Sequence, residues 1–179
     1  MTAALKRPYL TLGLHPTARG FGWVVFEGPF TPHDWGVSNA TNRRGDKNEY
    51  CLRRIEKLFV KFQPDTLVLE AFESHTSKRQ QRVVRLCRAI ASLAMDRGMD
   101  VAVYRRGDVR ACFASVGART RDEIAAAVAR HFDALHPRLP ASRWAWQSEG
   151  LSMALFSAAA LVLTHHQLGA SSLFEGLGL

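Results

Sequence analysis

The sequence predicts an α/β fold with a mixed β-sheet, and three observations lead to this expectation. Short apolar runs of strand length occur along the chain, and segments with helical spacing separate the later ones. The first runs follow one another closely, as in an antiparallel meander, whereas the later runs alternate with helices, as in parallel crossovers. At 179 residues, the chain has the length of one domain with a substantial core. We therefore expect a single domain over residues 1–179, with short flexible ends at about 1–8 and 167–179.

Three strands are expected near the beginning of the chain. Leucines alternate with smaller residues over Tyr9–His15, which is the spacing of a strand with one buried face. After a turn that contains proline and glycine, Gly22–Phe26 is a second apolar run, and His33–Val37 has the length of a third strand. The polar loop that follows, Ser38–Lys47, carries three basic residues: Arg43, Arg44 and Lys47.

The rest of the chain predicts four helices and two more strands. Apolar residues recur at helical intervals in Asn48–Phe62, Arg82–Arg97, Thr120–His131 and Ser148–His166. The third of these helices begins with a capping box, in which Thr120 is followed three residues later by Glu123. Apolar runs with the length of buried parallel strands lie between the helices, at Thr66–Leu69 and Val101–Tyr104.

The charge balance of the chain is strongly basic. There are 24 lysine and arginine residues against 16 aspartate and glutamate residues, which gives a net charge of +8 and a pI of about 10.0. Such an excess indicates a polyanionic partner such as nucleic acid. A basic protein whose charges serve only its solubility is the alternative.

The cysteines and the apolar segments argue against several classes of protein. Cys51, Cys87 and Cys112 are widely spaced and odd in number, which disfavours a disulfide framework or a zinc site and fits a reducing compartment. Residues 1–8 lack the apolar core of a signal peptide, and the most apolar stretch, Leu151–Leu163, is too short to cross a membrane. We expect a cytoplasmic protein with no membrane partner.

Two strand ends carry the features from which a function can be argued. Glu70 directly follows the apolar run Thr66–Leu69, and open α/β sheets bind their ligands at the carboxyl ends of such strands. His15 ends the first strand, and the turn behind it leads into the glycine-rich run Gly20–Trp23. For Glu70, the alternative is an ordinary surface carboxylate in a loop.

Four segments together resemble the RuvC family. Gly13–Trp23 reads Gly-Leu-His-Pro-Thr-Ala-Arg-Gly-Phe-Gly-Trp and is similar to the family's opening, in which Gly-Ile-Asp-Pro-Gly leads into a Thr-Gly-Tyr-Gly run. Leu67–Glu70 is similar to the second family motif, an apolar strand that ends in a catalytic Glu. Arg82–Asp133 resembles the following helix, short strand and helix, and Ala154–His165 resembles the apolar closing helix with its Thr-His ending. The likeness covers about residues 9–166.

The resemblance implies an RNase H-like fold, with a mixed five-stranded sheet flanked by helices. RuvC proteins are Holliday-junction resolvases of DNA recombination. They are homodimers that cut branched DNA with two Mg²⁺ or Mn²⁺ ions held by four carboxylates. Such hard cations prefer oxygen ligands and neutralise the charge that builds on the scissile phosphate. By resemblance, we expect a homodimer whose partner is nucleic acid, in the form of branched or duplex DNA.

This sequence departs from the family in its carboxylates, of which only Glu70 is clearly retained. His15 stands where the family has its first Asp, and an imidazole is a poor ligand for Mg²⁺, although Mn²⁺ or Zn²⁺ accepts one. The sequence leaves open whether another acid, such as Asp34 or Asp108, enters the folded site.

The family's closing helix carries an Asp-x-x-Asp pair, and neither possible alignment recovers it. In the first alignment the pair falls on Ser148 and Leu151, with Glu149 as the acid nearby. In the second alignment, made from the Thr-His ending, the pair falls on Ala154 and Ser157. Three of the four expected carboxylates are therefore missing.

Three functions follow from these residues. The first is a pseudoenzyme that binds nucleic acid through a degenerate site. The second is an active metal-dependent Holliday-junction endonuclease with a rearranged catalytic set: His15, Glu70, Glu149 and Arg121. In that case Glu70 and Glu149 would be the metal ligands, Mg²⁺ or Mn²⁺ the cofactor, and Arg121 would stand near a family Lys. The third is a protein-interaction module whose basic face binds an acidic protein.

Basic residues near these strand ends are the candidate nucleic-acid contacts. The set consists of Lys78, Arg79, Arg82, Arg85, Arg119 and Arg121, together with Phe72, which stands near a family aromatic that stacks at the junction. Three further arginines surround the end of the strand Val101–Tyr104: Arg105, Arg106 and Arg110. Contacts of this kind to phosphate supply affinity and position rather than sequence specificity. Solvated helix faces without a partner are the alternative.

Overall fold

The computed structural model describes residues 7–71, 78–141 and 150–176 of the chain. Its strands are β1 Leu10–Thr17, β2 Gly20–Glu27, β3 Thr31–Asn39, β4 Thr66–Glu70 and β5 Asp100–Tyr104. Its helices are α1 Lys47–Phe62, α2 Lys78–Asp96, α3 Arg106–Ala114, α4 Arg121–His131 and α5 Ser152–Gly176, with a short 3₁₀ helix at His136–Arg138.

The five strands form one mixed sheet in the order β3-β2-β1-β4-β5. β1, β2 and β3 pair as an antiparallel meander, whereas β1 with β4 and β4 with β5 pair in parallel. The predicted α/β fold with a mixed five-stranded sheet is therefore confirmed. Helices connect the parallel strands, because such connections have to cross from one end of the sheet to the other.

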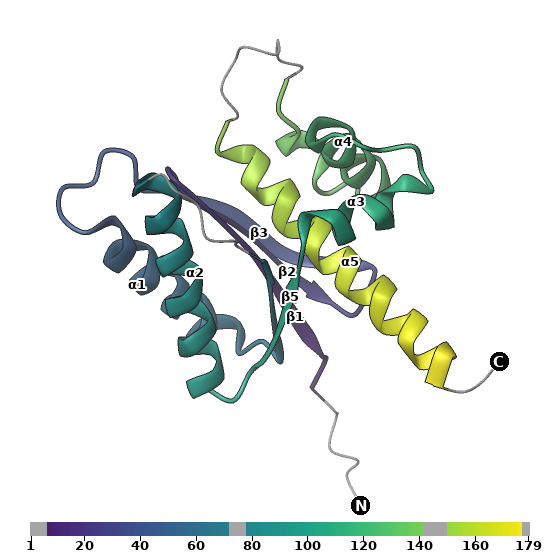
Figure 1. Cartoon of the computed structure of the whole chain (residues 1–179), viewed down its shortest axis with the longest axis horizontal. Coiled ribbons are helices and arrows are strands. Elements are labelled where there is room, and N and C mark those ends of the chain that lie inside the picture. The colour runs from purple at the N-terminus through teal and green to yellow at the C-terminus, as the bar shows by residue number, and fades with distance from the viewer. Residues whose placement is uncertain (1–6, 72–77, 142–149, 177–179) are drawn as a thin grey trace, which may run out of the picture.

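Helices cover both faces of the sheet, so the molecule has three layers (Figure 1). α1 and α2 lie on one face, and α5, with α3 and α4 packed beside it, lies on the other. Side chains alternate along β1, so Leu12 and Leu14 belong to the core under α1 and α2, while Gly13 faces α5. The same alternation in β2 points Val24 and Phe26 toward α4 and α5.

Two glycines let α5 lie directly on the sheet. A β-carbon at Gly13 would come within 2.5 Å of the Ala158 carbonyl oxygen, and one at Gly22 within 2.2 Å of the Ala154 carbonyl carbon. Real side chains do not tolerate such distances, so these two positions accept only glycine at this helix-to-strand spacing. This close contact determines which α5 residues lie over the end of β1 and the beginning of β2.

α5 is apolar on all sides over its first half, as expected for a helix enclosed by other elements. Its residues from Met153 to Val162 are buried, apart from Ser157, which is half-buried. On one side it contacts the sheet, and on the other it packs against α4 and α3. No helix in the described ranges is both long enough and apolar enough to cross a membrane.

The structure corrects several predicted boundaries. α2 begins at Lys78 rather than Arg82, and α5 begins at Ser152 and continues to Gly176 rather than ending near His166. No proline stops α5 there, and the single Gly169 costs too little to end a long helix. α3 was not predicted, because nine residues with a glycine near the start carry little periodicity.

The capping box of α4 is confirmed, with Glu123 N donating to Thr120 Oγ1 at 3.2 Å and Thr120 N to Glu123 Oε2 at 2.9 Å.

Replacing Gly22 with alanine should force α5 away from β2. We expect Gly22→Ala to lower the free energy of unfolding by about 1–3 kcal/mol, the usual cost of overpacking. Urea denaturation measures the effect. Gly107→Ala is the matched control, because nothing lies within 4 Å of a β-carbon there and alanine favours a helix. Equal stability of the two variants would show that the Gly22 contact does not constrain α5.

Candidate functional site

His15 and Glu70 meet at the carboxyl ends of neighbouring parallel strands. Gly13 of β1 is paired with Val68 of β4, and His15 and Glu70 each lie two residues further along. Residues two apart share a face, so both side chains are on the α5 face to which Gly13 belongs. His15 Nδ1 lies 3.2 Å from Glu70 Oε2. The sequence predicted His15 and Glu70 as candidate site residues, and the fold brings their side chains into contact.

The pair is largely withdrawn from solvent. The side chain of His15 is 6% exposed and that of Glu70 is 16% exposed. The ring nitrogen of His15 is close to the carboxylate but is not aligned for a hydrogen bond. Burial opposes ionisation of Glu70, but His15 and the charges of Arg121 and Arg106 outweigh burial and hold the pKa of Glu70 below its usual value.

A small cavity of about 40 Å³ adjoins Glu70 between α3, α4 and α5. Three arginines line it, Arg106 and Arg110 from α3 and Arg121 from α4. Ser157 of α5 is also in its wall, and the remaining wall is apolar. We call this cavity the arginine hollow. Its charged residues are one carboxylate and three guanidinium groups.

The described α5 residues beside this site are uncharged, and four of them line the hollow: Phe156, Ser157, Ala160 and Leu161. Ala154 packs against Gly22, which is the β2 residue paired with His15. Ser157, one turn later, lines the arginine hollow beside Glu70. Ala154 and Ser157 are the two positions of the second alignment made from the sequence, whereas Ser148 of the first alignment lies outside the described residues.

The side chains around Glu70 do not suit a pair of divalent cations. Mg²⁺ needs several oxygen ligands and negative charge nearby, whereas a histidine and arginines surround this carboxylate. Within the described ranges, no three His, Cys, Asp or Glu residues are grouped so that they could hold a metal ion. Asp34 is instead paired with Lys61 at 2.9 Å. Asp108 caps α3 by accepting a hydrogen bond from Arg105 N at 2.7 Å.

Some predicted site residues lie outside the described residues. These are Phe72, Ser148 and Glu149, the last of which was a predicted catalytic residue and metal ligand. For Arg79 the backbone belongs to α2, but the side chain is not described.

Arg82 makes hydrogen bonds within the protein. Its guanidinium donates to Asn48 Oδ1 at 2.6 Å, to the Ala18 carbonyl at 2.9 Å and to the Thr17 carbonyl at 3.4 Å. Asn48 Nδ2 in turn donates to the Arg82 carbonyl at 3.1 Å. Arg82 therefore ties the β1–β2 turn to the beginning of α1 and to α2. The helical spacing of the basic residues could not reveal these contacts, because their partners lie 34 and more residues away.

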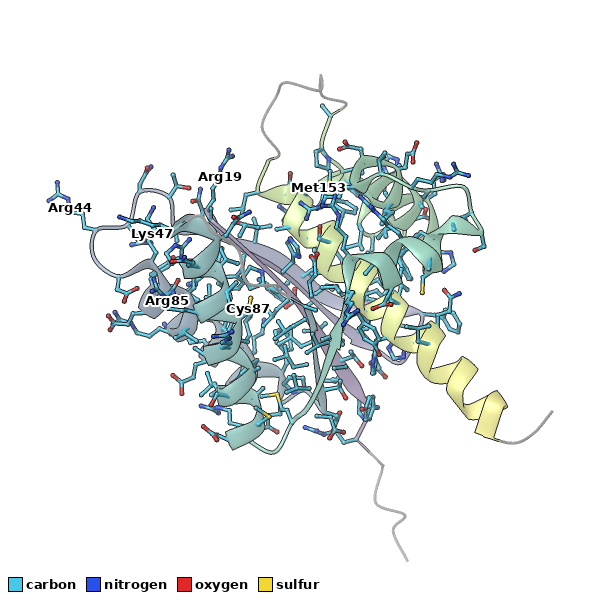
Figure 2. All side chains as sticks on the ribbon, in the orientation of Figure 1. Arg19, Arg44, Lys47, Arg85, Cys87 and Met153 are labelled. Carbon is cyan, nitrogen blue, oxygen red and sulfur yellow. The ribbon has the colours of Figure 1, made fainter. Side chains whose placement is uncertain are left out.

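Other basic side chains extend from this scaffold into solvent. Figure 2 shows Arg19, Arg44, Lys47 and Arg85 on one side of the molecule, around the starts of α1 and α2. Arg19, Arg44 and Arg85 are exposed, and Lys47 is half-buried. Lys78 and Arg119, which the sequence also predicted as contacts, are exposed at the beginning of α2 and before α4. Arg19 and Arg44 were not among the predicted contacts, although the turn that carries Arg19 follows β1, the strand of His15.

Known structures share this arrangement of strands and helices. RuvC of Thermus thermophilus, in complex with Holliday junction substrate, matches with a TM-score of 0.67 and 16% identity, over 91% of this chain and 96% of that chain. The chain has a RuvC-like fold. Another structure of T. thermophilus RuvC gives a TM-score of 0.63, at the same identity and coverage. The yeast mitochondrial Holliday junction resolvase Ydc2 gives 0.63 at 14% identity, over 94% of this chain and 84% of that chain.

No protein-family model and no curated protein sequence matches the chain. The RuvC-like fold confirms what the four sequence segments indicated together. At this level of identity the likeness concerns the fold, so the activity of this RuvC-like chain has to be argued from its own residues. Those residues are the His15–Glu70 pair, the arginine hollow and the basic side chains around α1 and α2.

Replacing Glu70 with glutamine should change how stability depends on pH. Because the pKa of Glu70 is lower in the folded than in the unfolded chain, its ionised form stabilises the fold above about pH 4.3, the unfolded value. That contribution is lost as the pH falls through the folded pKa. Urea denaturation should therefore show a larger stability advantage of wild type over Glu70→Gln at about pH 5.5 than at about pH 3. A constant difference would contradict the lowered pKa.

Proposed function

We propose that this RuvC-like chain binds nucleic acid, with branched DNA as its substrate class, and that it has lost metal-dependent cutting. The observation that carries the proposal is the composition of the site. Among the described residues, the carboxylate at this site is Glu70, which contacts His15 at 3.2 Å, and the adjoining hollow is lined by arginines. Such a site attracts phosphate but cannot neutralise two divalent cations.

The chemistry of phosphodiester hydrolysis explains why this composition opposes cutting. Two-metal nucleases need ligands that hold one cation at the attacking water and another at the leaving oxygen. Of the α5 residues near this site, Ser157 lines the hollow beside Glu70 and Ala154 packs against Gly22, the strand partner of His15, and neither carries a negative charge.

Basic side chains support binding along a surface next to this site. We call the group Arg19, Arg44, Lys47 and Arg85 the basic edge (Figure 2). Its members come from three separate parts of the sequence: the β1–β2 turn, the loop after β3 with the beginning of α1, and α2. Arg82 holds these three parts together, so the charges keep a fixed spacing. A fixed array of cations fits a regularly spaced phosphate backbone.

The class of nucleic acid is proposed from the neighbouring structures. One of them is a RuvC in complex with a Holliday junction, and another is a Holliday junction resolvase from yeast mitochondria. A four-way junction has two-fold symmetry, and a homodimer presents two equal binding surfaces that match it. We therefore propose that two copies of this chain recognise one junction.

Binding and cutting of a labelled four-way junction test this function. We expect the wild-type chain to bind the junction more tightly than duplex DNA of the same length, and to leave it uncut with Mg²⁺ or Mn²⁺. We expect His15→Asp also to leave it uncut, because Ala154 and Ser157 still supply no carboxylate. Gel mobility and denaturing gels report the two properties. Metal-dependent cutting that Glu70→Gln abolishes would mean that this is an active endonuclease. Salt-insensitive or absent binding would instead favour a protein-interaction module.

Removing charge from the basic edge should weaken binding without unfolding the protein. Arg19→Ala with Arg85→Ala is expected to reduce junction affinity, and to reduce the slope of log affinity against log salt by about 2, one for each lost phosphate contact. The double variant Arg130→Ala with Arg138→Ala is the control, because it removes equal charge from exposed positions on α4 and the 3₁₀ helix. Equal salt slopes in the two double variants would exclude the basic edge as a contact surface.

A further inference from the structure

The arginine hollow has the opposite charge from a metal site. A pair of divalent cations requires an excess of carboxylates, but three guanidinium groups and one carboxylate line this cavity. The Glu70 charge is also partly engaged, because His15 lies against it. The local excess of positive charge therefore favours an anion in the cavity.

Two helices place these arginines. Arg106 is the first residue of α3 and Arg121 is the first residue of α4, so both helices begin at the hollow. Asp108, Asp122 and Glu123 lie in the first turns of these helices and offset their partial positive charge, so the guanidinium groups supply the positive charge. Arg106 and Arg121 are also near enough to Glu70 for their charges to lower its pKa. Glu70 thus helps to hold these arginines at the hollow.

The size of the cavity limits what can enter it. A volume of about 40 Å³ is that of a few water-sized groups. The outer oxygens of one phosphate fit such a space, whereas a base or a sugar does not. Guanidinium groups donate in a planar fork that matches phosphate oxygens, and such charge-assisted hydrogen bonds are the stronger ones in proteins.

We propose that the arginine hollow binds one backbone phosphate of nucleic acid directly, with Arg106, Arg110 and Arg121 in place of divalent metal ions. This inference rests on the proposed function and adds the point at which the nucleic acid is held. The basic edge then binds neighbouring phosphates, and the hollow fixes the register of the strand. Because no metal takes part, affinity does not depend on Mg²⁺ beyond its effect as a salt.

The test compares junction affinity in EDTA and in Mg²⁺ at equal ionic strength. For Arg110→Ala with Arg121→Ala, we expect at least about a tenfold loss of affinity, from two charge-assisted contacts. The control, Arg130→Ala with Arg138→Ala, should bind nearly as wild type does. Arg110→Ala alone should give a smaller loss in the same direction, and it leaves the half-buried Arg121 in place. Circular dichroism on heating checks that each variant is folded.

Different results overturn different parts of the account. If the wild-type chain binds no nucleic acid, both the proposed function and the inference are wrong. If the wild-type chain binds but Arg110→Ala with Arg121→Ala binds equally well, only the inference is wrong. Binding that appears only when Mg²⁺ is added would also overturn the inference, since it would mean that a metal ion is needed to hold the phosphate.

Inorganic phosphate separates a nucleic-acid site from a site for a free anion. We expect phosphate to compete with the junction more strongly than chloride at equal ionic strength, and this advantage to disappear in the Arg110→Ala, Arg121→Ala variant. Suppose instead that phosphate raises the melting temperature of wild type but not of the variant, while junction affinity is the same for both. The hollow would then hold a free anion, and the nucleic-acid assignment would be overturned.

Discussion

The close packing of α5 on β1 and β2 is the constraint on which the rest of the site depends. Gly13 and Gly22 have no side chains, so the helix backbone lies against the strands at distances that a β-carbon would not allow. This contact sets the position of each α5 residue above the sheet, with Ala154 over Gly22 and Ser157 at the arginine hollow. The helix thus brings an alanine and a serine, rather than carboxylates, toward the ends of the strands that carry His15 and Glu70.

The described residues opposite α5 also provide little negative charge. His15 near the end of β1 contacts Glu70 at the end of β4, so this carboxylate lies against an imidazole. Arg106, Arg110 and Arg121 then give the cavity a net positive charge. These residues fit one another, because a cluster of carboxylates without cations would repel itself, whereas the arginines balance the charge of Glu70. The fold is RuvC-like, and the described charged residues around the hollow are three arginines and Glu70.

The sequence predicted the sheet and most helices because their signals are local, such as the alternating leucines of β1 and the capping box of α4. It also predicted Glu70 and His15 as site residues, and the fold brings the two side chains into contact. Other features depend on partners far away in the sequence. The bonds from Arg82 to Asn48 and Ala18 make it part of the scaffold, and Gly22 contacts Ala154, which lies much further along the chain in α5. α3 carries too little periodicity to be predicted, so the gathering of its arginines with Arg121 became visible only in the fold.

Titration of the wild-type chain with Mn²⁺ in the absence of DNA, followed by calorimetry, tests the proposed loss of metal binding at Glu70 most directly. We predict no saturable binding of Mn²⁺ that depends on Glu70, so wild type and Glu70→Gln should both give only the heat of dilution. Stoichiometric binding of Mn²⁺ by wild type that Glu70→Gln abolishes would contradict it. That result would show that the site still collects enough oxygen ligands to hold a metal ion despite its histidine and arginines.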